Sequence, residues 1–544
     1  MLIENERKMK NKSKRILIIE WFGIICLSLI YLIPLLATKG AMYGDDLHFH
    51  LDRLTGLSNV FSSPINFENF SGTGQGVNLF YPWIFFYPFY LFYKLTRSFY
   101  LAWYIYLYLI NIVTIAVSYY SAKSIFKRIR PSFVFALLYS FTGYRLDNIL
   151  VRFATGEILA MAFIPLIFLG VYQLIKGDYK KWYILAGGMT LLTYSHLLSV
   201  YITSIVIGVI LMTTFYFWND KVKRLLYFAL ATIVTVVLTS FQTLPMLEQF
   251  FALKLTSPDV HTLNETTFGL DSIISTSLSN SATAHTIGLI VLVCLVFLLS
   301  RFNRLGKEDK YLLVLTIALL FATSNFMPWG VLKNTPIYMV QFAWRLLTYI
   351  AIFVAYLVAK QATIIKKTDL LLLAAAIVAL HFGTVLREVR QFSTSPIRNP
   401  WAELSYRNSM QQMLDAVDVN DYANETSPEK RQTILKHEIY LDGQKVDIPL
   451  SVSASAVSLK IVNSSDKAEE LILPFYFYKG QRASINGKQV KSYLSKNGST
   501  ALVIPRDKVV SVRITYSYTA IAKISALISV LSAAAFLLYL FFKR

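Results

Sequence analysis

The sequence predicts a polytopic α-helical membrane protein that carries a small β-rich domain just before its last helix. Three observations support this fold class. The 544 residues are 55% hydrophobic and only 16% charged, and their mean hydropathy is +0.49. Apolar runs close to the ~20 residues that cross a bilayer recur along the chain. A polar stretch with strand-like alternation interrupts these runs near the C-terminus. Such a composition excludes an ordinary soluble enzyme.

About twelve apolar runs are candidate membrane spans, although several are shorter than the ~17 residues usually needed. The first follows a basic N-terminus and lacks a clear small-residue cleavage site, so we interpret it as an uncleaved span. The predicted spans are 16–37, 100–122, 131–143, 153–175, 182–196, 198–218, 225–243, 286–300, 311–326, 338–359, 368–386 and 520–542.

The distribution of basic residues predicts the orientation of these spans. With the termini placed inside, the inner segments hold 25 Lys and Arg residues and the short outer loops hold 8. This is the positive-inside asymmetry, and it predicts that both termini are cytoplasmic. The net charge of +21 therefore reflects topology, and no nucleic-acid partner is expected. We expect a multipass membrane protein whose polar site faces outward.

The outer segments define the expected domain organisation. Residues 38–99 form one long outer loop, in which the aromatic stretch 79–97 suits an interfacial segment better than a span. A transmembrane module occupies 1–386, an extracytoplasmic β-rich domain occupies 387–519, and a C-terminal helix occupies 520–544. Within the β-rich domain, 457–462, 471–476 and 511–516 alternate as strands. Asp442-Gly443 and Asn486-Gly487 are signals of hairpin turns.

A dense charged cluster follows the first predicted span. It contains Asp45, Asp46, His50 and Arg53. Charge is expensive beside a bilayer, so such a cluster indicates a functional site. A carboxylate here can deprotonate an acceptor hydroxyl or help to hold a divalent cation, and the histidine and arginine can bind phosphate or orient the base. The simpler alternative is a solvated start of a loop.

Further polar residues lie at the outer ends of other predicted spans. Arg152 and Glu157 flank the start of one span, where the alternative to function is an ion pair that locks two helices. Arg345, with Gln341 nearby, suits bidentate binding of a lipid phosphate, or else it reaches to the headgroups. Weaker candidates are His196 and Glu248, which on their own more often pack or cap helices. The cytoplasmic ends carry mainly Lys and Arg in loops.

Taken in order, these pieces resemble the GT-C superfamily of membrane glycosyltransferases. More narrowly, the chain resembles the YfhO-type bacterial proteins and their pyruvoyl-tetrahydropterin-synthase-related relatives. The matching pieces are Gly44, Asp45, His50 and Arg53; Arg152 and Glu157; Ser195 and His196; Leu244, Pro245 and Glu248; Gln341, Phe342, Trp344 and Arg345; and the outer β domain with Leu473-Pro474 and Ile485-Asn486-Gly487.

The resemblance implies a bacterial cell membrane, a sugar donor carried on a polyprenyl phosphate and an outward-facing active site. The acceptor would be a cell-envelope glycopolymer, such as a teichoic acid or another surface polysaccharide. Asp45 is the favoured general base, and Arg345 or Arg152 would neutralise the phosphate that leaves. Asp46 could instead bind a divalent cation such as Mg²⁺ or Mn²⁺, since such enzymes differ in their metal dependence.

Three other functions fit part of the sequence. A flippase of lipid-linked saccharides would also gather charged groups in a cavity, but it would more naturally show two related halves. A polymerase of lipid-linked saccharides would place its key residues in large central loops. A non-catalytic envelope assembly factor would use the β domain for binding, and it would tolerate substitution of Asp45.

Overall fold

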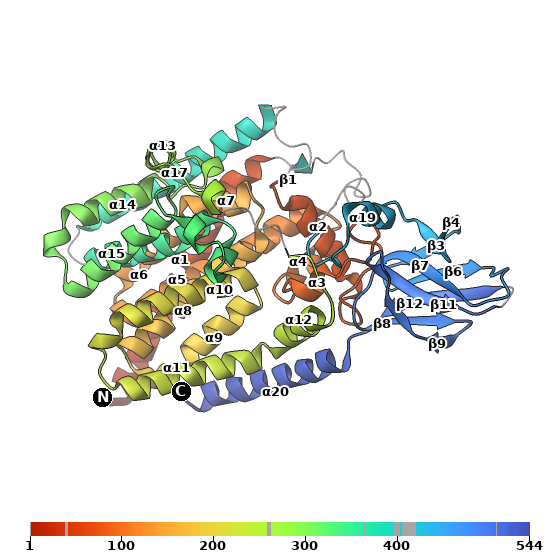
Figure 1. The fold of residues 1–544 in the computed structure, drawn as a ribbon. Coiled ribbons are helices and arrows are strands. Elements are labelled where there is room, and N and C mark those ends of the chain that lie inside the picture. The colour runs from red at the N-terminus through yellow and green to blue at the C-terminus, as the bar shows by residue number, and fades with distance from the viewer. Residues whose placement is uncertain are drawn as a thin grey trace.

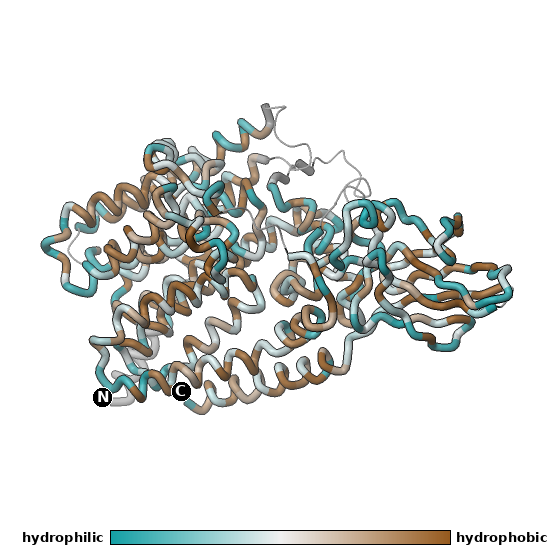
Figure 2. The backbone as a smooth tube through the Cα atoms, in the orientation of Figure 1, coloured by the Kyte–Doolittle hydropathy of each residue, from teal (hydrophilic) through white to brown (hydrophobic). Residues whose placement is uncertain are grey.

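The computed structural model describes residues 2–38, 42–257, 263–362, 366–394, 403–404, 420–506 and 509–543. They form a bundle of long helices and a β domain at one end of it (Figure 1). The two ends of the described chain lie together at the opposite end of the bundle (Figure 1). Brown, apolar backbone runs along the helices between these two ends (Figure 2). The predicted fold class, a polytopic membrane protein with a β domain, is confirmed.

Within the described residues, seven helices are long and apolar enough to cross a membrane. An eighth candidate is a pair, α11 (Lys221–Leu238) and α12 (Ser240–Ala252), that bends by 73° at a short break. The seven are α1 (Leu2–Leu32, apolar from Lys14 onward), α5 (Phe99–Phe126), α8 (Thr155–Ile175), α10 (Leu197–Thr214), the span Ala343–Gln361, which consists of a 3₁₀ turn followed by α16 (Leu347–Gln361), α17 (Lys367–Thr394) and α20 (Ala520–Phe542).

The expected number of about twelve spans is therefore too high. Four of the predicted spans fall on shorter helices of 11 to 16 residues. A helix rises 1.5 Å per residue, so these helices fall short of a hydrocarbon core of ~30 Å. Apolar composition alone could not separate them from spans, because they are also mainly apolar and differ from the spans in length. They are α6 (Ile129–Ser140), α9 (Tyr183–Thr193), α14 (Leu289–Ser300) and α15 (Lys307–Ala322).

The segment 38–99, which the sequence predicts to be the first outer loop, folds into short helices where the structure describes it. In the stretch 79–97 the only helix longer than one turn is α4, which has ten residues and a proline in its first turn; no single helix spans this stretch. The described elements of the loop are β1 (Met42–Tyr43), α2 (Leu47–Thr55), α3 (Val77–Phe80) and α4 (Tyr87–Thr96). Two further short helices lie near the site described below, α7 (Gly143–Leu150) and α13 (Leu270–Leu278).

The β domain is a sandwich of two five-stranded antiparallel sheets, with strand orders β10-β11-β7-β3-β4 and β5-β6-β12-β8-β9. Both predicted hairpin turns are present, and each has two consecutive residues at positive φ, as a two-residue turn of this kind requires. The elements are α19 (Pro428–Leu435), β3 (Ile439–Leu441), β4 (Gln444–Val446), β5 (Ser451–Ser453), β6 (Ala456–Ile461), β7 (Glu469–Tyr476), β8 (Gln481–Ile485), β9 (Lys488–Val490), β10 (Ser492–Leu494), β11 (Ser499–Ile504) and β12 (Val510–Tyr516).

The β domain shares a hydrophobic core with the first outer loop. Ile65, Phe67 and Phe80 of that loop pack in the same cluster as Leu471 and Phe475 of β7. Backbone hydrogen bonds also join the two parts, from the amide of Tyr476 to the carbonyl of Thr73, for example (2.9 Å). The domain is thus built onto the loop that carries the acidic cluster. The proposed boundary at residue 387 falls within α17, which continues to Thr394.

Candidate functional site

The acidic start of the first outer loop lies against the turn between α7 and α8. The amides of Asp45 and Asp46 donate to the carbonyls of Val151 (3.0 Å) and Arg152 (2.9 Å). Gly44 makes this approach possible, because its φ is +146° and an added Cβ would lie 2.9 Å from the backbone nitrogen of Phe153. The backbone thereby brings two motifs that are about 100 residues apart in sequence to one place.

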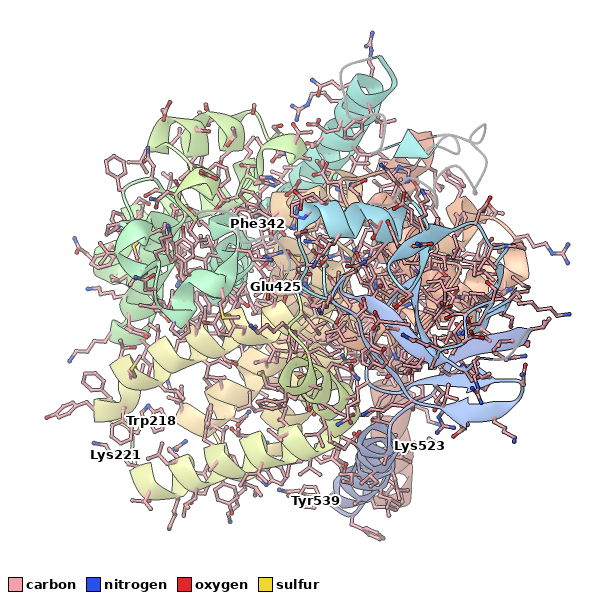
Figure 3. The ribbon with its side chains drawn as sticks, turned by 45° about the vertical axis from the view of Figure 1, so that its right-hand side comes forward. Trp218, Lys221, Phe342, Glu425, Lys523 and Tyr539 are labelled. Carbon is pink, nitrogen blue, oxygen red and sulfur yellow. The ribbon has the colours of Figure 1, made fainter. Side chains whose placement is uncertain are left out.

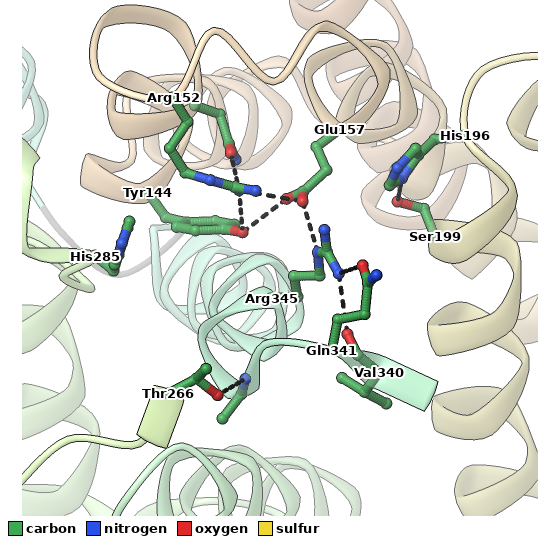
Figure 4. Close-up of polar contacts among 12 residues, drawn as sticks. Tyr144, Arg152, Glu157, His196, Ser199, Thr266, His285, Val340, Gln341 and Arg345 are labelled. Carbon is green, nitrogen blue, oxygen red and sulfur yellow. Dashed lines mark hydrogen bonds and ion pairs between the residues drawn. The ribbon is translucent and has the colours of Figure 1, made fainter. Parts of the chain in front are cut away.

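Glu157, in the first turn of α8, is the centre of a buried ionic network (Figure 4). Its Oε1 accepts from the Nε of Arg345 (2.7 Å) and lies 3.1 Å from NH1 of Arg152. Its Oε2 accepts from the hydroxyl of Tyr144 (2.7 Å). Arg152 is held further by Asn148, whose Oδ1 accepts from NH1 (2.6 Å). One carboxylate therefore neutralises one of two guanidinium charges, and the network keeps a positive charge.

Arg345 is positioned by a strained turn. Gln341 has φ 65° and ψ −53°, and the amide of Phe342 donates to the carbonyl of Val340 (2.8 Å), which closes a γ-turn with positive φ. This turn is rare for a residue with a side chain, and it costs free energy. It directs both the Val340 carbonyl (3.0 Å) and the Gln341 side chain (2.8 Å) to NH1 of Arg345. The turn therefore fixes the guanidinium just before the start of α16.

Both arginines keep donor capacity that the network does not use. For the residues that the structure describes, the NH2 nitrogens of Arg152 and Arg345 have no hydrogen-bond partner. Each guanidinium also lies over the ring of Phe342, with Cζ at 6.0 and 4.7 Å from the ring centre. Two adjacent guanidinium groups with free donors suit binding of an anion such as a phosphate.

The two aspartates of the cluster differ in their surroundings. Asp45 is exposed, whereas Asp46 is half-buried. Burial raises the pKa of Asp46 from 3.8 to about 6, the positive charge of Arg152 opposes that rise, and the charges of Asp45 and Glu157 add to it. Asp46 thus lies within electrostatic reach of the arginine network. A carboxyl with such a pKa is ionised at neutral pH and is a stronger base than an exposed aspartate.

His50 and Arg53 lie inside the loop. Arg53 is 1% exposed; its NH2 donates to the carbonyl of Pro82 (3.1 Å), and its guanidinium lies over the ring of Tyr81, with Cζ 4.0 Å from the ring centre. Nδ1 of His50 lies 3.1 Å both from Arg53 and from the hydroxyl of Thr155 in the first turn of α8. Burial holds the pKa of His50 well below its usual range. These contacts fit residues that attach the loop to α8.

His196 approaches the network from another side, and Glu248 lies apart from it. The ring of His196 is 5.6 Å from the ring of Tyr81, and its Nδ1 is 2.8 Å from the hydroxyl of Ser199. Glu248 instead pairs with Lys479 of the β domain (3.1 Å) and accepts from Thr519 at the start of α20. The structure therefore brings Arg152, Glu157, Gln341 and Arg345 together, with Asp46 and His196 nearby. It assigns Glu248 to the junction with the β domain.

Sequence reasoning missed a second buried acid beside this network. Asp147 of α7 is fully buried, and its Oδ2 lies 2.7 Å from Nδ1 of His285. The imidazole of His285 stacks on Trp344 (4.1 Å between ring centres, 18° between planes), and Trp344 stacks on Phe342 (4.5 Å, 11°). No local spacing signals this arrangement, because its residues come from three distant segments.

For the residues that the structure describes, no group of three or more His, Cys, Asp or Glu side chains converges on a point that could hold a metal ion. Asp45 and Asp46 are consecutive in sequence, but the two arginines nearby neutralise part of the negative charge that a cation would need.

The fold and the site define a multispanning membrane protein with an ionic network buried near the end of the bundle that carries the β domain. A family model described as "6-pyruvoyl-tetrahydropterin synthase related domain; membrane protein" matches residues 79–390, more than half of the chain. The chain therefore belongs to this family of membrane proteins. No curated protein matches it. The matched region includes Arg152, Glu157 and Arg345, and it excludes both Asp45 and the β sandwich.

Proposed function

We propose that this protein is a glycosyltransferase that moves a sugar from a polyprenyl-phosphate donor to a cell-envelope polymer on the outer face of the membrane. The observation that carries the proposal is the convergence of Arg152 and Arg345 on Glu157, beside the loop of Asp46. Two guanidinium groups with unused donors and a neighbouring carboxylate are the groups that this reaction needs.

In the proposed reaction the donor phosphate binds to the free donors of Arg152 and Arg345. A carboxylate of the first outer loop takes the proton of the acceptor hydroxyl, whose oxygen then attacks the anomeric carbon. The bond from that carbon to the phosphate oxygen breaks, and the polyprenyl phosphate leaves with the bonding electrons. Half-burial supports Asp46 as the base over the exposed Asp45, because burial raises the pKa of Asp46 to about 6.

Glu157 acts in this proposal as a positioning residue. It holds both guanidinium groups in a fixed orientation, so the donors need not reorganise as negative charge develops on the leaving phosphate. It neutralises only one of the two guanidinium charges, so the group of Arg152, Arg345 and Glu157 keeps one positive charge that can attract an anionic donor. Desolvation in the apolar bundle strengthens that attraction.

One observation favours a second candidate, a flippase of lipid-linked saccharides. The 73° bend between α11 and α12 is of the kind found in the broken helices of transporters. A flippase would move the lipid-linked sugar between leaflets and leave its sugar–phosphate bond intact. The two functions therefore differ in their product.

Reconstituted full-length protein tests the proposal. It is incubated with radiolabelled undecaprenyl-phosphate-linked hexoses and with envelope polymer prepared from the host cell. We expect label in the polymer with the wild type, no transfer above background with Arg345→Gln, and wild-type transfer with the control Arg301→Gln, which changes an arginine that follows α14. Movement of intact lipid between leaflets without transfer would overturn the proposal in favour of the flippase.

A further inference from the structure

The proposed phosphate site does not use the pair of Asp147 and His285. His285 lies beside that site, next to Tyr144 in Figure 4. A buried carboxylate needs a partner, and for the described residues Oδ1 of Asp147 has none. Its one partner is Nδ1 of His285. Burial raises the pKa of Asp147, and the hydrogen bond from His285 opposes that rise.

The hydrogen bond fixes which nitrogen of His285 is available. An ionised Asp147 can only accept, so Nδ1 of His285 carries the proton that is shared with it. Nε2 has no hydrogen-bond partner among the described residues, and the side chain is 20% exposed. His285 therefore keeps an unpaired ring nitrogen on a partly exposed side chain, and the hydrogen bond to Asp147 holds the orientation of the ring.

Aromatic rings connect this polar edge to the arginines. Trp344 stacks on Phe342 on one side and on His285 on the other, and each of the three side chains is only partly buried. At one end of this stack the guanidinium of Arg345 covers Phe342, and at the other end Asp147 holds His285. Nε1 of Trp344 is buried without a hydrogen-bond partner among the described residues. Phe342 lies toward the end of the bundle that carries the β domain, and Trp218 lies at the opposite end (Figure 3).

The length of this aromatic stack suits a sugar ring that is bonded to a phosphate. Successive centres are 4.7 Å apart from Arg345 to Phe342, 4.5 Å from Phe342 to Trp344 and 4.1 Å from Trp344 to His285. A phosphate held by Arg345 is too small to reach His285. The group bonded directly to that phosphate in the proposed donor is a sugar, whose ring carries hydroxyl groups at its far edge.

We propose that His285, positioned by Asp147, hydrogen-bonds a hydroxyl of the donor sugar, while the edges of Phe342 and Trp344 form the wall of the sugar subsite. The inference rests on the proposed function, because it takes the donor phosphate to lie at Arg152 and Arg345. It assigns discrimination between sugars to His285 and binding of the lipid phosphate to the arginines. Sites that hydrogen-bond a ligand hydroxyl reject ligands without it, because the protein group is then left unpaired.

The test compares two ligands of the full-length protein in lipid nanodiscs. One is undecaprenyl phosphate, and the other is the same lipid bearing glucose, galactose, mannose or N-acetylglucosamine. The ratio of their dissociation constants measures how much the sugar contributes to the binding affinity of the lipid. We expect wild-type protein to bind one of the sugar-bearing lipids about tenfold more tightly than the bare lipid phosphate.

The variant is the double substitution His285→Phe with Asp147→Leu. Phenylalanine keeps the stacking on Trp344, and leucine removes the carboxylate that would otherwise be left buried and unpaired. We expect the ratio to fall to about one in this variant. Undecaprenyl phosphate should still bind at least as tightly as to the wild type, because Asp147→Leu removes a negative charge near Arg152. The control His437→Asn, which changes an exposed histidine next to the β domain, keeps the wild-type ratio.

The possible failures are distinguishable. A wild-type ratio near one, or an unchanged ratio in the double variant, would overturn the sugar subsite and leave the proposed function standing. Loss of undecaprenyl phosphate binding in a folded double variant would overturn the division of roles between His285 and the arginines. Failure of the wild type to bind either lipid would overturn the proposed function, and the subsite with it.

Discussion

Arg345 donates from Nε to the carboxylate of Glu157 at 2.7 Å, although the two residues are 188 positions apart in the chain. The contact joins the first turn of α8 to the start of α16, and a second arginine, Arg152, reaches the same carboxylate oxygen. Both buried guanidinium groups thus depend on a single carboxylate for their counter-charge. We therefore expect the site to tolerate substitution of Glu157 poorly.

Replacing Glu157 by Gln tests that dependence. The amide keeps the size of the side chain but leaves two buried guanidinium groups without a counter-charge. We expect the free energy of unfolding to fall by about 3 to 5 kcal/mol, measured by thermal or denaturant unfolding in detergent. The matched control is Glu308→Gln, which removes an exposed ion pair with Lys176 and should cost under about 1 kcal/mol. Equal losses in the two variants would contradict the account.

Arg345→Lys tests whether the geometry of the guanidinium matters in addition to its charge. Lysine keeps the positive charge, but its three N–H donors cannot serve Glu157, the Val340 carbonyl, Gln341 and a phosphate together. We expect transfer to fall on the order of 10²-fold or more, as when a donor to a developing negative charge is removed. Steady-state transfer rates at saturating donor provide the measurement, and a rate within about twofold of the wild type would exclude a direct role for Arg345.

The raised pKa of Asp46 predicts how transfer depends on pH. If the ionised carboxylate is the base, the rate rises with pH through a midpoint near 6. Asp45→Asn removes a neighbouring negative charge that raises this pKa, so the midpoint should move to lower pH. Asp46→Asn should abolish the pH-dependent rate. A pH–rate profile of each variant checks this, and an unchanged midpoint in Asp45→Asn would count against Asp46.

The same pKa has a consequence for stability. The pKa of Asp46 is higher in the folded protein than its ordinary value of 3.8, so ionisation disfavours the folded state. The contribution of Asp46 to stability is full below pH 3.8 and declines as the pH rises through about 6. Unfolding measured from pH 4 to pH 7 should therefore show a smaller decline in Asp46→Asn than in the wild type. Parallel curves would show that the carboxyl is solvated.

A substitution in the γ-turn at Gln341 tests backbone strain and lipid binding separately. Glycine tolerates positive φ, so Gln341→Gly relieves about 1 to 3 kcal/mol of backbone strain while it removes the amide that accepts from Arg345. We expect a melting temperature equal to or above that of the wild type, together with weaker binding of undecaprenyl phosphate. A variant that is both less stable and fully active would mean that the turn serves folding alone.

Substitution of Glu248 should affect the junction with the β domain and should not affect lipid binding, because the partners of Glu248 lie at that junction. Its partners are Lys479 and Thr519, and the neighbouring Gln249 exchanges two hydrogen bonds with the backbone of Lys479 (2.8 and 2.9 Å). Glu248→Gln should increase amide hydrogen exchange around 477–480 and leave binding of undecaprenyl phosphate unchanged. Weakened lipid binding with unchanged exchange would restore the substrate-binding role that the sequence suggested.

The fold class and most of the ionic network could be predicted from sequence. Hydrophobic runs and the Asn486-Gly487 type of turn are local signals, and charged residues at helix ends are costly enough to stand out. The number of spans could not be predicted, because α6 and α14 are as apolar as true spans and differ only in length. The role of Glu248 was also hidden, since its partner Lys479 is 231 positions away in the β sandwich.

The stack of His285 on Trp344 illustrates what sequence does not reveal. His285 belongs to a polar outer segment, Trp344 to the start of α16 and Asp147 to α7, and each looks ordinary in its own window. Only packing places them together. The strained turn at Gln341 is equally invisible, because glutamine carries no preference for positive φ.

The most direct test of the central claim is made in cells whose only copy of the protein carries Asp46→Asn, with the amount of protein in the membrane checked alongside. The account predicts that the envelope polymer loses its sugar while the polyprenyl-phosphate-linked donor accumulates, as quantified by mass spectrometry of both fractions. Normal sugar on the polymer, with normal levels of the variant in the membrane, would contradict it.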